Sequence, residues 1–222
     1  MGLTGGFPID IILFGMIAAF LVLRLRGILG RRTGFEQPPG PIAPRDTASA
    51  QPVQGQGVVP PVAGARKTLP DPGSALGQTL TGMAAMDRDF EPASFLDGAE
   101  KAFQIIVRAF AAGDRGQLRP LLGEDTWHAF EAAITDREKA AHTQISDIRA
   151  MHALSIEQAE LKGSLASVTV RIVSDQVNMT HGASGQVLVG TDAVTEITDL
   201  WTFERDLHQA DPVWHLVAAR SA

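Results

Sequence analysis

The sequence predicts an α+β protein in which helices pack on one face of a curved antiparallel sheet, preceded by a transmembrane helix and a disordered linker. Three observations predict this organisation. An apolar stretch lies near the start, a Pro- and Gly-rich segment follows it, and apolar residues then recur first at helical and later at alternating spacing. We therefore expect a membrane anchor over residues 1–32, a linker over 33–92 and a folded domain over 93–222.

The anchor is predicted from residues 11–23, which include no polar side chain. Counting from Phe7, the apolar stretch approaches the shortest helix that crosses about 30 Å of hydrocarbon. No Lys or Arg precedes it, whereas four arginines follow directly, and positive charge stays on the cytoplasmic side. We therefore expect a single span with the N-terminus outside and the C-terminal domain in the cytoplasm. These arginines either set the topology alone or also contact anionic lipid headgroups. They are Arg24, Arg26, Arg31 and Arg32.

The linker is predicted from composition, because ten of the 13 prolines fall between residues 33 and 92, among many Gly, Gln and Ala. Pro removes backbone donors and Gly adds entropy to the unfolded chain, so burial cannot offset the cost of ordering such a segment. Leu76, Leu80 and Met83 have helical spacing within residues 74–86. Because two glycines weaken this helix, we expect only a transient helix within the linker.

The folded domain begins with helical periodicity. Ser94 and Asp97 have the spacing of a capping box, and an apolar stripe from Phe95 predicts a helix that ends before Gly113. A short helical turn is expected over residues 117–122. A third helix is expected from Asp125 to about residue 141, and its apolar residues are Trp127, Phe130 and Ile134.

After residue 143 the apolar period falls to two, which predicts strands. The first strand is expected to turn His152 to the same face as Ile148 and Leu154, and Lys162-Gly163 makes a tight turn into the second strand. A Gly-containing loop leads to a third strand over about 194–206, and a last strand covers about 213–218. In the third strand the inward positions are Ile197, Asp199, Trp201 and Phe203.

Several segments of the domain resemble a known family in their order and spacing. They are Phe95-Leu96-Asp97-Gly98-Ala99, Ala109-Phe110-Ala111-Ala112-Gly113-Asp114, Leu118-Arg119-Pro120-Leu121-Leu122, Arg171-Ile172-Val173-Ser174, Asp199-Leu200-Trp201-Thr202-Phe203-Glu204-Arg205 and Asp211-Pro212-Val213-Trp214. Over about residues 92–219 the chain resembles the C-terminal domain of the import-motor anchor of the mitochondrial inner membrane. The apolar stretch, the arginines and the Pro-rich linker are similar to bacterial, membrane-anchored members.

This resemblance implies a cone-shaped fold like that of nuclear transport factor two, with an apolar pocket between helices and sheet. It also implies a scaffold in a bacterial inner membrane whose partner is a translocase or a chaperone, and it allows a lipid ligand. The chaperone-recruiting N-terminal region of the mitochondrial protein is not recognisable in residues 33–92.

The net charge of the folded domain excludes some classes of partner. Residues 93–222 carry 11 Lys and Arg against 18 Asp and Glu, a net charge of −7. Such a domain is repelled by nucleic acid and by anionic lipid, so we expect no nucleic-acid partner.

His152 and Asp199 are two polar residues at positions predicted to face inward. They suggest an alternative to the adaptor, namely a pocket that binds a ligand or carries out catalysis. Burial perturbs ionisation, and cone folds also house isomerases and dehydratases that use an acid or a His. The alternative is therefore a lipid or small-molecule pocket, with or without catalysis. A structural His or Asp is the commoner outcome, so we expect a non-enzymatic adaptor. Aromatic residues at such positions are more often part of the core, although some of them line pockets. The pocket candidates are Trp127, Phe130, His152, Ile197, Asp199, Trp201 and Phe203.

Metal and nucleophile chemistry find little support in the sequence. The six His are scattered without the spacing of paired ligands, and the chain has no Cys. We therefore expect no metal site and no cofactor.

Overall fold

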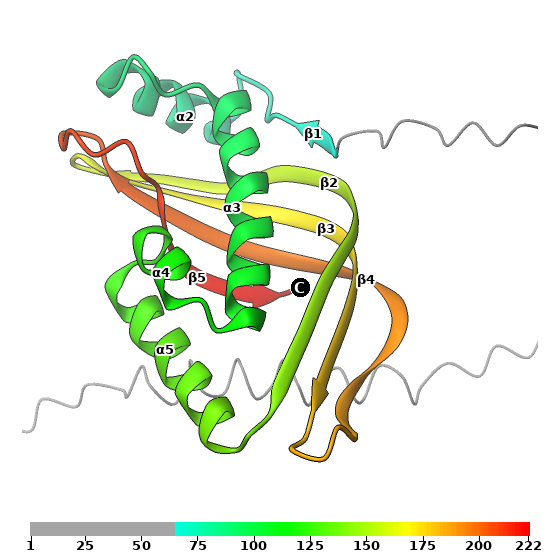
Figure 1. Ribbon diagram of the computed structural model, residues 1–222. Coiled ribbons are helices and arrows are strands. Elements are labelled where there is room, and N and C mark those ends of the chain that lie inside the picture. The colour runs from blue at the N-terminus through cyan, green and yellow to red at the C-terminus, as the bar shows by residue number, and fades with distance from the viewer. Residues whose placement is uncertain (1–64) are drawn as a thin grey trace, which may run out of the picture.

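The computed structural model describes residues 65–222, and it confirms the α+β prediction with helices packed on a curved sheet (Figure 1). The five strands lie side by side in chain order. Strands β2 to β5 form the predicted antiparallel meander, whereas β1 joins the edge parallel to β2, which makes the sheet mixed. The strand bounds are β1 Arg66–Thr68, β2 Thr143–Lys162, β3 Leu165–His181, β4 Val187–Asp206 and β5 His215–Ser221. The predicted anchor, its four arginines and the linker up to residue 64 lie outside the described residues.

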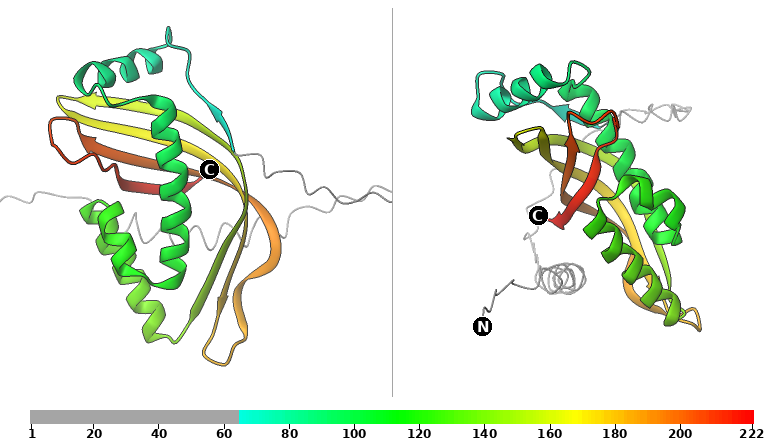
Figure 2. Two further views of the ribbon diagram at one scale, coloured as in Figure 1. Left: turned by 45° about the horizontal axis from the view of Figure 1, so that its top comes forward. Right: turned by 90° about the vertical axis from the view of Figure 1, so that its left-hand side faces the viewer.

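The helices α3 and α5 lie on the same face of the sheet, and α2 lies at its edge (Figure 2). A short α4 and a 3₁₀ turn over Arg119–Leu121 connect α3 to α5. No helix within residues 65–222 is long and apolar enough to cross a membrane. The helix bounds are α2 Ala75–Met86, α3 Pro92–Ala112, α4 Arg115–Leu118 and α5 Glu124–Lys139.

Helix α3 buries the predicted stripe, with Phe103 and Ile106 almost fully enclosed. It ends at Gly113, whose φ of 72° is the left-handed conformation that glycine adopts without strain. Its start differs from the predicted capping box, because the carboxylate of Glu91 accepts hydrogen bonds from the backbone of Ala93 and Ser94. Pro92 therefore does not delay the helix, since the first helical position needs no N–H donor.

The sequence predicts that the folded domain begins at residue 93. In the structure the folded part begins well before that residue, with β1 and α2. Leu80 and Met83 of α2 are buried in the main core, so the expectation of a transient linker helix is wrong. Three ion pairs hold this segment to the domain: Arg205 of β4 contacts Asp87 at 2.8 Å, and Lys67 of β1 contacts two carboxylates of α3, Asp97 and Glu100. Tertiary burial thus outweighs the weak helix propensity that glycine gives to α2.

The two long hairpins differ in how well the sequence locates their turns. The predicted turn at Gly163 is present, with φ 61°. Strand β4, in contrast, begins at Val187 and not near Val194. Gly190 lies inside β4 with φ 86°, and a Cβ there would lie 2.0 Å from the carbonyl oxygen of Asn178. Glycine therefore allows the strand to continue where the sequence suggests a loop.

The sheet curves around α3, and β-bulges interrupt the β2–β3 pairing along this curve (Figure 1). One register shift lies between Met151 and Ala153. Because a bulge places two residues opposite one, the alternation of faces fails there. Met151 and Leu154 both pack on the core, while His152 turns to the opposite face beside Asp175. The prediction that His152 faces inward is wrong for this reason.

Candidate functional site

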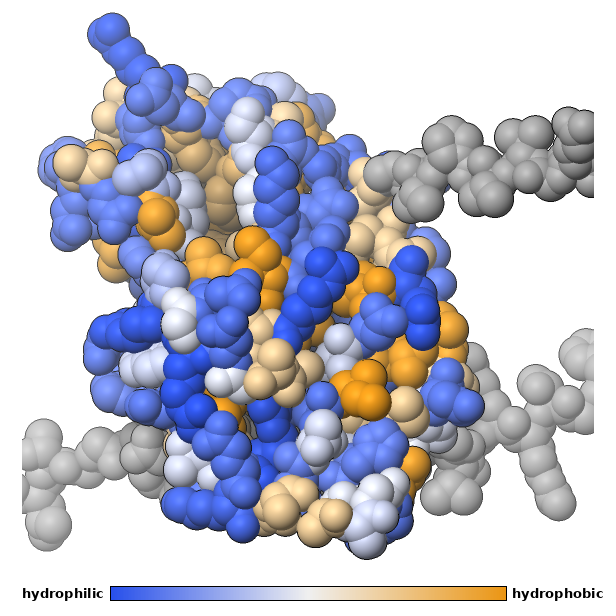
Figure 3. All heavy atoms as spheres, in the orientation of Figure 1, coloured by the Kyte–Doolittle hydropathy of each residue, from blue (hydrophilic) through white to orange (hydrophobic). Residues whose placement is uncertain are grey.

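The candidate site is a pocket of about 450 Å³ between the first half of α3 and the loop that joins β4 to β5. Figure 3 shows apolar atoms in the hollow between these two elements. The volume lies within the range of pockets that hold small ligands or anchor side chains. Most of the lining is apolar, and it includes Phe90, Phe95, Leu121, Phe203 and Trp214.

Four aromatic rings form the wall of the pocket. The ring centroids of Phe95 and Trp214 lie 4.8 Å apart in an edge-on arrangement, and Phe95 meets Phe203 in the same way at 6.1 Å. Phe90 closes the cluster at 5.7 Å from Trp214. Edge-to-face packing stabilises such clusters beyond the burial of area, so this wall is preformed. Trp214 itself remains partly exposed, whereas the three Phe rings are buried.

The rim of the pocket is mainly acidic. Asp89 and Glu91 line it, and backbone hydrogen bonds from Ser94 and Ala93 lower the pKa of Glu91, which keeps this carboxylate ionised. Arg205 also lines the pocket, but its guanidinium is held by Asp87 and by the carbonyl of Asp211. The rim therefore presents negative charge around an apolar floor.

Gly98 leaves open space beside the pocket. It lies within α3, lines the pocket, and no atom lies within 4 Å of the position a Cβ would take. A glycine in a helix interior costs about 1 kcal/mol relative to Ala. Gly98 is exposed and nothing in the described residues fills this space, so a large side chain at this position has room to extend over the pocket.

A second group of polar residues is buried on the face of the sheet that packs against α3. The amide of Gln176 donates to Ser174 Oγ at 3.0 Å, and Asn178 donates to Gln176 Oε1 at 3.1 Å. Asp199 accepts from Ser221 Oγ at 3.3 Å and, at a long 3.4 Å, from Gln176 Nε2. Every polar side-chain atom buried within residues 65–222 has a hydrogen-bond partner.

Asp199 is the titratable residue of this group. Burial raises the pKa of Asp199 from its ordinary value of 3.8 to about 6, and the hydrogen bonds from Ser221 and Gln176 oppose the rise. The carboxyl therefore exchanges its proton near neutral pH. The residues that line the aromatic pocket do not include Asp199, so the two features are separate.

The structure distributes the predicted pocket residues over different environments. Phe203 alone among them lines the aromatic pocket, while Asp199 and Trp201 are buried and Ile197 is half-buried. The half-buried Trp127 and Phe130 pack on the core from α5, where Phe130 meets Phe110 at a centroid distance of 4.7 Å.

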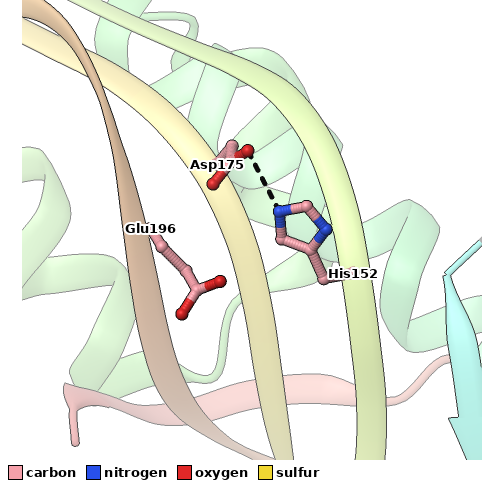
Figure 4. A group of neighbouring side chains, drawn as sticks. All are labelled: His152, Asp175 and Glu196. Carbon is pink, nitrogen blue, oxygen red and sulfur yellow. Dashed lines mark ion pairs between the residues drawn. The ribbon is translucent and has the colours of Figure 1, made fainter. Parts of the chain in front are cut away.

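His152 lies on the other face of the sheet, where it meets two carboxylates (Figure 4). Its Nε2 lies 3.0 Å from Asp175 Oδ2, and one ligand atom from each of His152, Asp175 and Glu196 lies within 4.8 Å of the others. The three residues come from β2, β3 and β4. His152 and Asp199 therefore share no cavity.

Sequence reasoning missed the main features of both sites. Trp214 and Phe95 belong to the segments that carry the family resemblance, but nothing in their spacing shows that they meet across the loop. The open space at Gly98 could have been suspected, because a glycine inside a strong amphipathic helix calls for a reason. The grouping of His152 with Asp175 and Glu196 depends on strand register and a bulge, neither of which has a sequence signature.

Comparison with known structures gives similarities below 25% identity. The intermembrane space region of the chloroplast protein ARC6 is 9% identical with a TM-score of 0.41, and covers 56% of this chain and 94% of its own. A putative dehydratase of the NTF2-like family from Streptomyces avermitilis is 11% identical with a TM-score of 0.35, and covers 59% and 96%. A conserved protein from Planctomyces limnophilus is 15% identical with a TM-score of 0.33, and covers 59% and 95%. At these scores the description of the fold rests on the chain's own structure.

Comparison of the sequence with curated proteins finds no match. Comparison with protein families does: residues 76–221 match the Tim44-like domain. The match begins in α2 and ends in β5, so it spans all but the first strand of the sheet and agrees with a folded part that starts before α3. It covers well over half of the sequence, and the chain therefore belongs to the Tim44-like domain family.

Proposed function

We propose that this protein is a non-enzymatic, membrane-anchored adaptor whose folded domain binds an apolar segment of a partner protein in the aromatic pocket. The observation that carries the proposal is the pocket itself, with a wall formed by Phe90, Phe95, Phe203 and Trp214 and an open space at Gly98. Trp214 is partly exposed while the three Phe rings behind it are buried, and an accessible Trp beside an apolar hollow is typical of the centre of a protein interface. Membership of the Tim44-like family is compatible with a binding role.

The charges around the pocket favour a particular occupant. Asp89 and Glu91 at the rim, together with the net charge of −7 on residues 93–222, repel an anionic lipid headgroup. The same charges attract Lys or Arg. We therefore assign the pocket to one or two apolar side chains of a protein segment that basic residues flank, as in the segment next to a transmembrane helix of a bacterial membrane protein.

The predicted anchor places this pocket close to a membrane. A span over residues 11–23 with cytoplasmic arginines holds the domain on the cytoplasmic side of a bacterial inner membrane. The partner is then a membrane assembly such as a translocase, or a chaperone that serves one. The Pro-rich segment between anchor and domain gives the domain room to reach it.

The alternative is a lipid or small-molecule ligand in this pocket, and the apolar lining and the volume of about 450 Å³ are the observations that favour it. Asp199, whose pKa burial raises to about 6, does not line the pocket and so does not contact such a ligand there. Catalysis by His152 and Asp199 acting together is disfavoured, since they lie on opposite faces of the sheet.

Photocrosslinking from the pocket tests the proposal. A photoreactive amino acid replaces Val213, which lines the pocket, in the full-length protein expressed in its own cells, and irradiated membranes are analysed by mass spectrometry. The matched probe position is Glu157, which is exposed on β2 away from the pocket. We expect a discrete crosslink to one membrane-associated protein from position 213 and none from position 157, and the crosslinked peptide to be apolar with flanking Lys or Arg.

Two variants of Gly98 supply the control. Gly98→Trp fills the open space, and Gly98→Ala leaves the pocket free, while either change improves helix propensity. We expect Gly98→Trp to abolish the crosslink and Gly98→Ala to retain it, with both proteins at least as stable as wild type. A crosslink to lipid alone, or one that Gly98→Trp leaves unchanged, would overturn the proposal.

A further inference from the structure

Three potential metal ligands meet on the face of the sheet that points away from α3 (Figure 4). His152 comes from β2, Asp175 from β3 and Glu196 from β4, which are neighbouring strands. In Figure 4 the imidazole points at the carboxylate of Asp175, and the carboxylate of Glu196 reaches from β4 toward the same space. The ligand atoms lie within 4.8 Å of one another, so small side-chain rotations bring them to the separation of about 3.4 Å that tetrahedral zinc requires.

The backbone places these side chains together at some cost. Asp175 and Glu196 are direct cross-strand partners on one face, where two like charges are destabilising. His152 reaches them only because the bulge between Met151 and Ala153 turns it out of the core. A single cation bound between the three side chains would relieve the repulsion of the carboxylates and use the histidine that the bulge supplies.

The ligand types indicate which cation fits. One imidazole nitrogen with two carboxylates is a set that Zn²⁺ and similar first-row divalent ions accept, whereas Mg²⁺ and Ca²⁺ prefer oxygen ligands alone. Three protein ligands leave a fourth position for water or for a group from another molecule. His152 and Glu196 are exposed and Asp175 is half-buried, so an ion can reach the site from solvent.

We propose that His152, Asp175 and Glu196 form a Zn²⁺ site that joins β2, β3 and β4 where bulges curve the sheet. The site is separate from the aromatic pocket and does not depend on the adaptor proposal. Bound zinc holds the curvature of the sheet, and the fourth position gives a partner protein a place to add a ligand.

Isothermal titration of the full-length protein in detergent with ZnCl₂ and with MgCl₂ tests this site. We expect one Zn²⁺ per chain and no saturable Mg²⁺ binding. His152→Gln and Glu196→Gln are each expected to weaken Zn²⁺ binding at least about tenfold. The matched control is His128→Gln, because His128 pairs with Glu124 at 3.1 Å on exposed α5, where Arg119 also contacts Glu124. This variant should bind Zn²⁺ within about twofold of wild type.

Thermal unfolding separates a metal ligand from a residue that only supports the fold. Without metal, Glu196→Gln should unfold at the wild-type temperature or above it, because the change removes the repulsion with Asp175. With Zn²⁺ the melting temperature of wild type should rise and that of Glu196→Gln should not. Absence of saturable Zn²⁺ binding, or an equal loss of binding in His128→Gln, would overturn the proposal.

Discussion

Replacing Asp199 by Asn should remove a pH dependence of stability that the buried carboxyl imposes on the domain. The side chain is 8% exposed, and burial raises its pKa from 3.8 to about 6. Asn has the same shape, can accept from Gln176 and can donate to Ser221, so the hydrogen bonds that Asp199 makes are kept.

The sign and size of this pH dependence of the unfolding free energy follow from the pKa values of Asp199 in the unfolded and folded states. Well below pH 3.8 the carboxyl is protonated in both states and has no differential effect. As pH rises from about 4 through about 6, the unfolded chain releases its proton first, so the folded state loses stability relative to the unfolded state. Because one pKa unit corresponds to about 1.4 kcal/mol, the total loss is about 3 kcal/mol and is complete above about pH 7. Because part of this loss has occurred by pH 4, Asp199→Asn should gain about 2.5 kcal/mol relative to wild type between pH 4 and pH 8.

Urea unfolding of wild type and variant at pH 4, 5, 6, 7 and 8 measures this difference. The matched control is Asp147→Asn, whose carboxylate is partly exposed beside Arg149 on β2, and its stability relative to wild type should change little over the same range. A stability difference for Asp199→Asn that stays constant with pH, or that falls as pH rises, would refute the reasoning.

Three further substitutions test how the domain is assembled. Met83→Ala should cost about 2–5 kcal/mol in urea unfolding because Met83 is fully buried, and a loss under 1 kcal/mol would show that α2 is not part of the core. Gly190→Ala should destabilise by more than about 2 kcal/mol, since it combines a φ of 86° with a Cβ 2.0 Å from the Asn178 carbonyl oxygen; a neutral result would contradict this close approach of β3 to Gly190. Arg205→Met should cost about 3 kcal/mol, because Asp87 is left largely buried without its partner, and Asp87→Leu in the same chain should restore part of the loss.

Local pattern was sufficient to predict the main elements of the domain. The apolar stripe and Gly113 located α3, and the two-residue period located the meander and its turn at Gly163. These features depend on residues close together in sequence, where helix and strand periods differ clearly. The α+β class followed from their order along the chain.

Long-range effects were not predictable in the same way. The Gly-containing helix α2 is stable because Leu80 and Met83 meet the rest of the core, which composition alone does not show. Strict alternation predicts that His152 faces inward, but one bulge turns it to the opposite face. The alternation that places Asp199 inward with Trp201 and Phe203 holds, because the pairing of β4 with β3 is uninterrupted over these residues.

The aromatic pocket was the part of the candidate site hardest to anticipate. Its wall combines Phe95 of α3 with Trp214 from the loop after β4, residues far apart in the chain. Apolar spacing predicts that such residues are buried, but it does not distinguish a filled core from an open hollow. That distinction depends on the path of the loop between β4 and β5 over the first half of α3.

The central claim is that the aromatic pocket binds a partner protein, and crosslinking from position 213 in Gly98→Trp and Gly98→Ala proteins tests it most directly. Both variants should fold with at least wild-type stability, so a difference between them reports on the pocket alone. We expect the crosslinked partner to be present with Gly98→Ala and to fall below about one tenth of that yield with Gly98→Trp, as expected when an interface hot spot is lost. Equal yields from the two proteins would contradict the assignment of the pocket as the binding site.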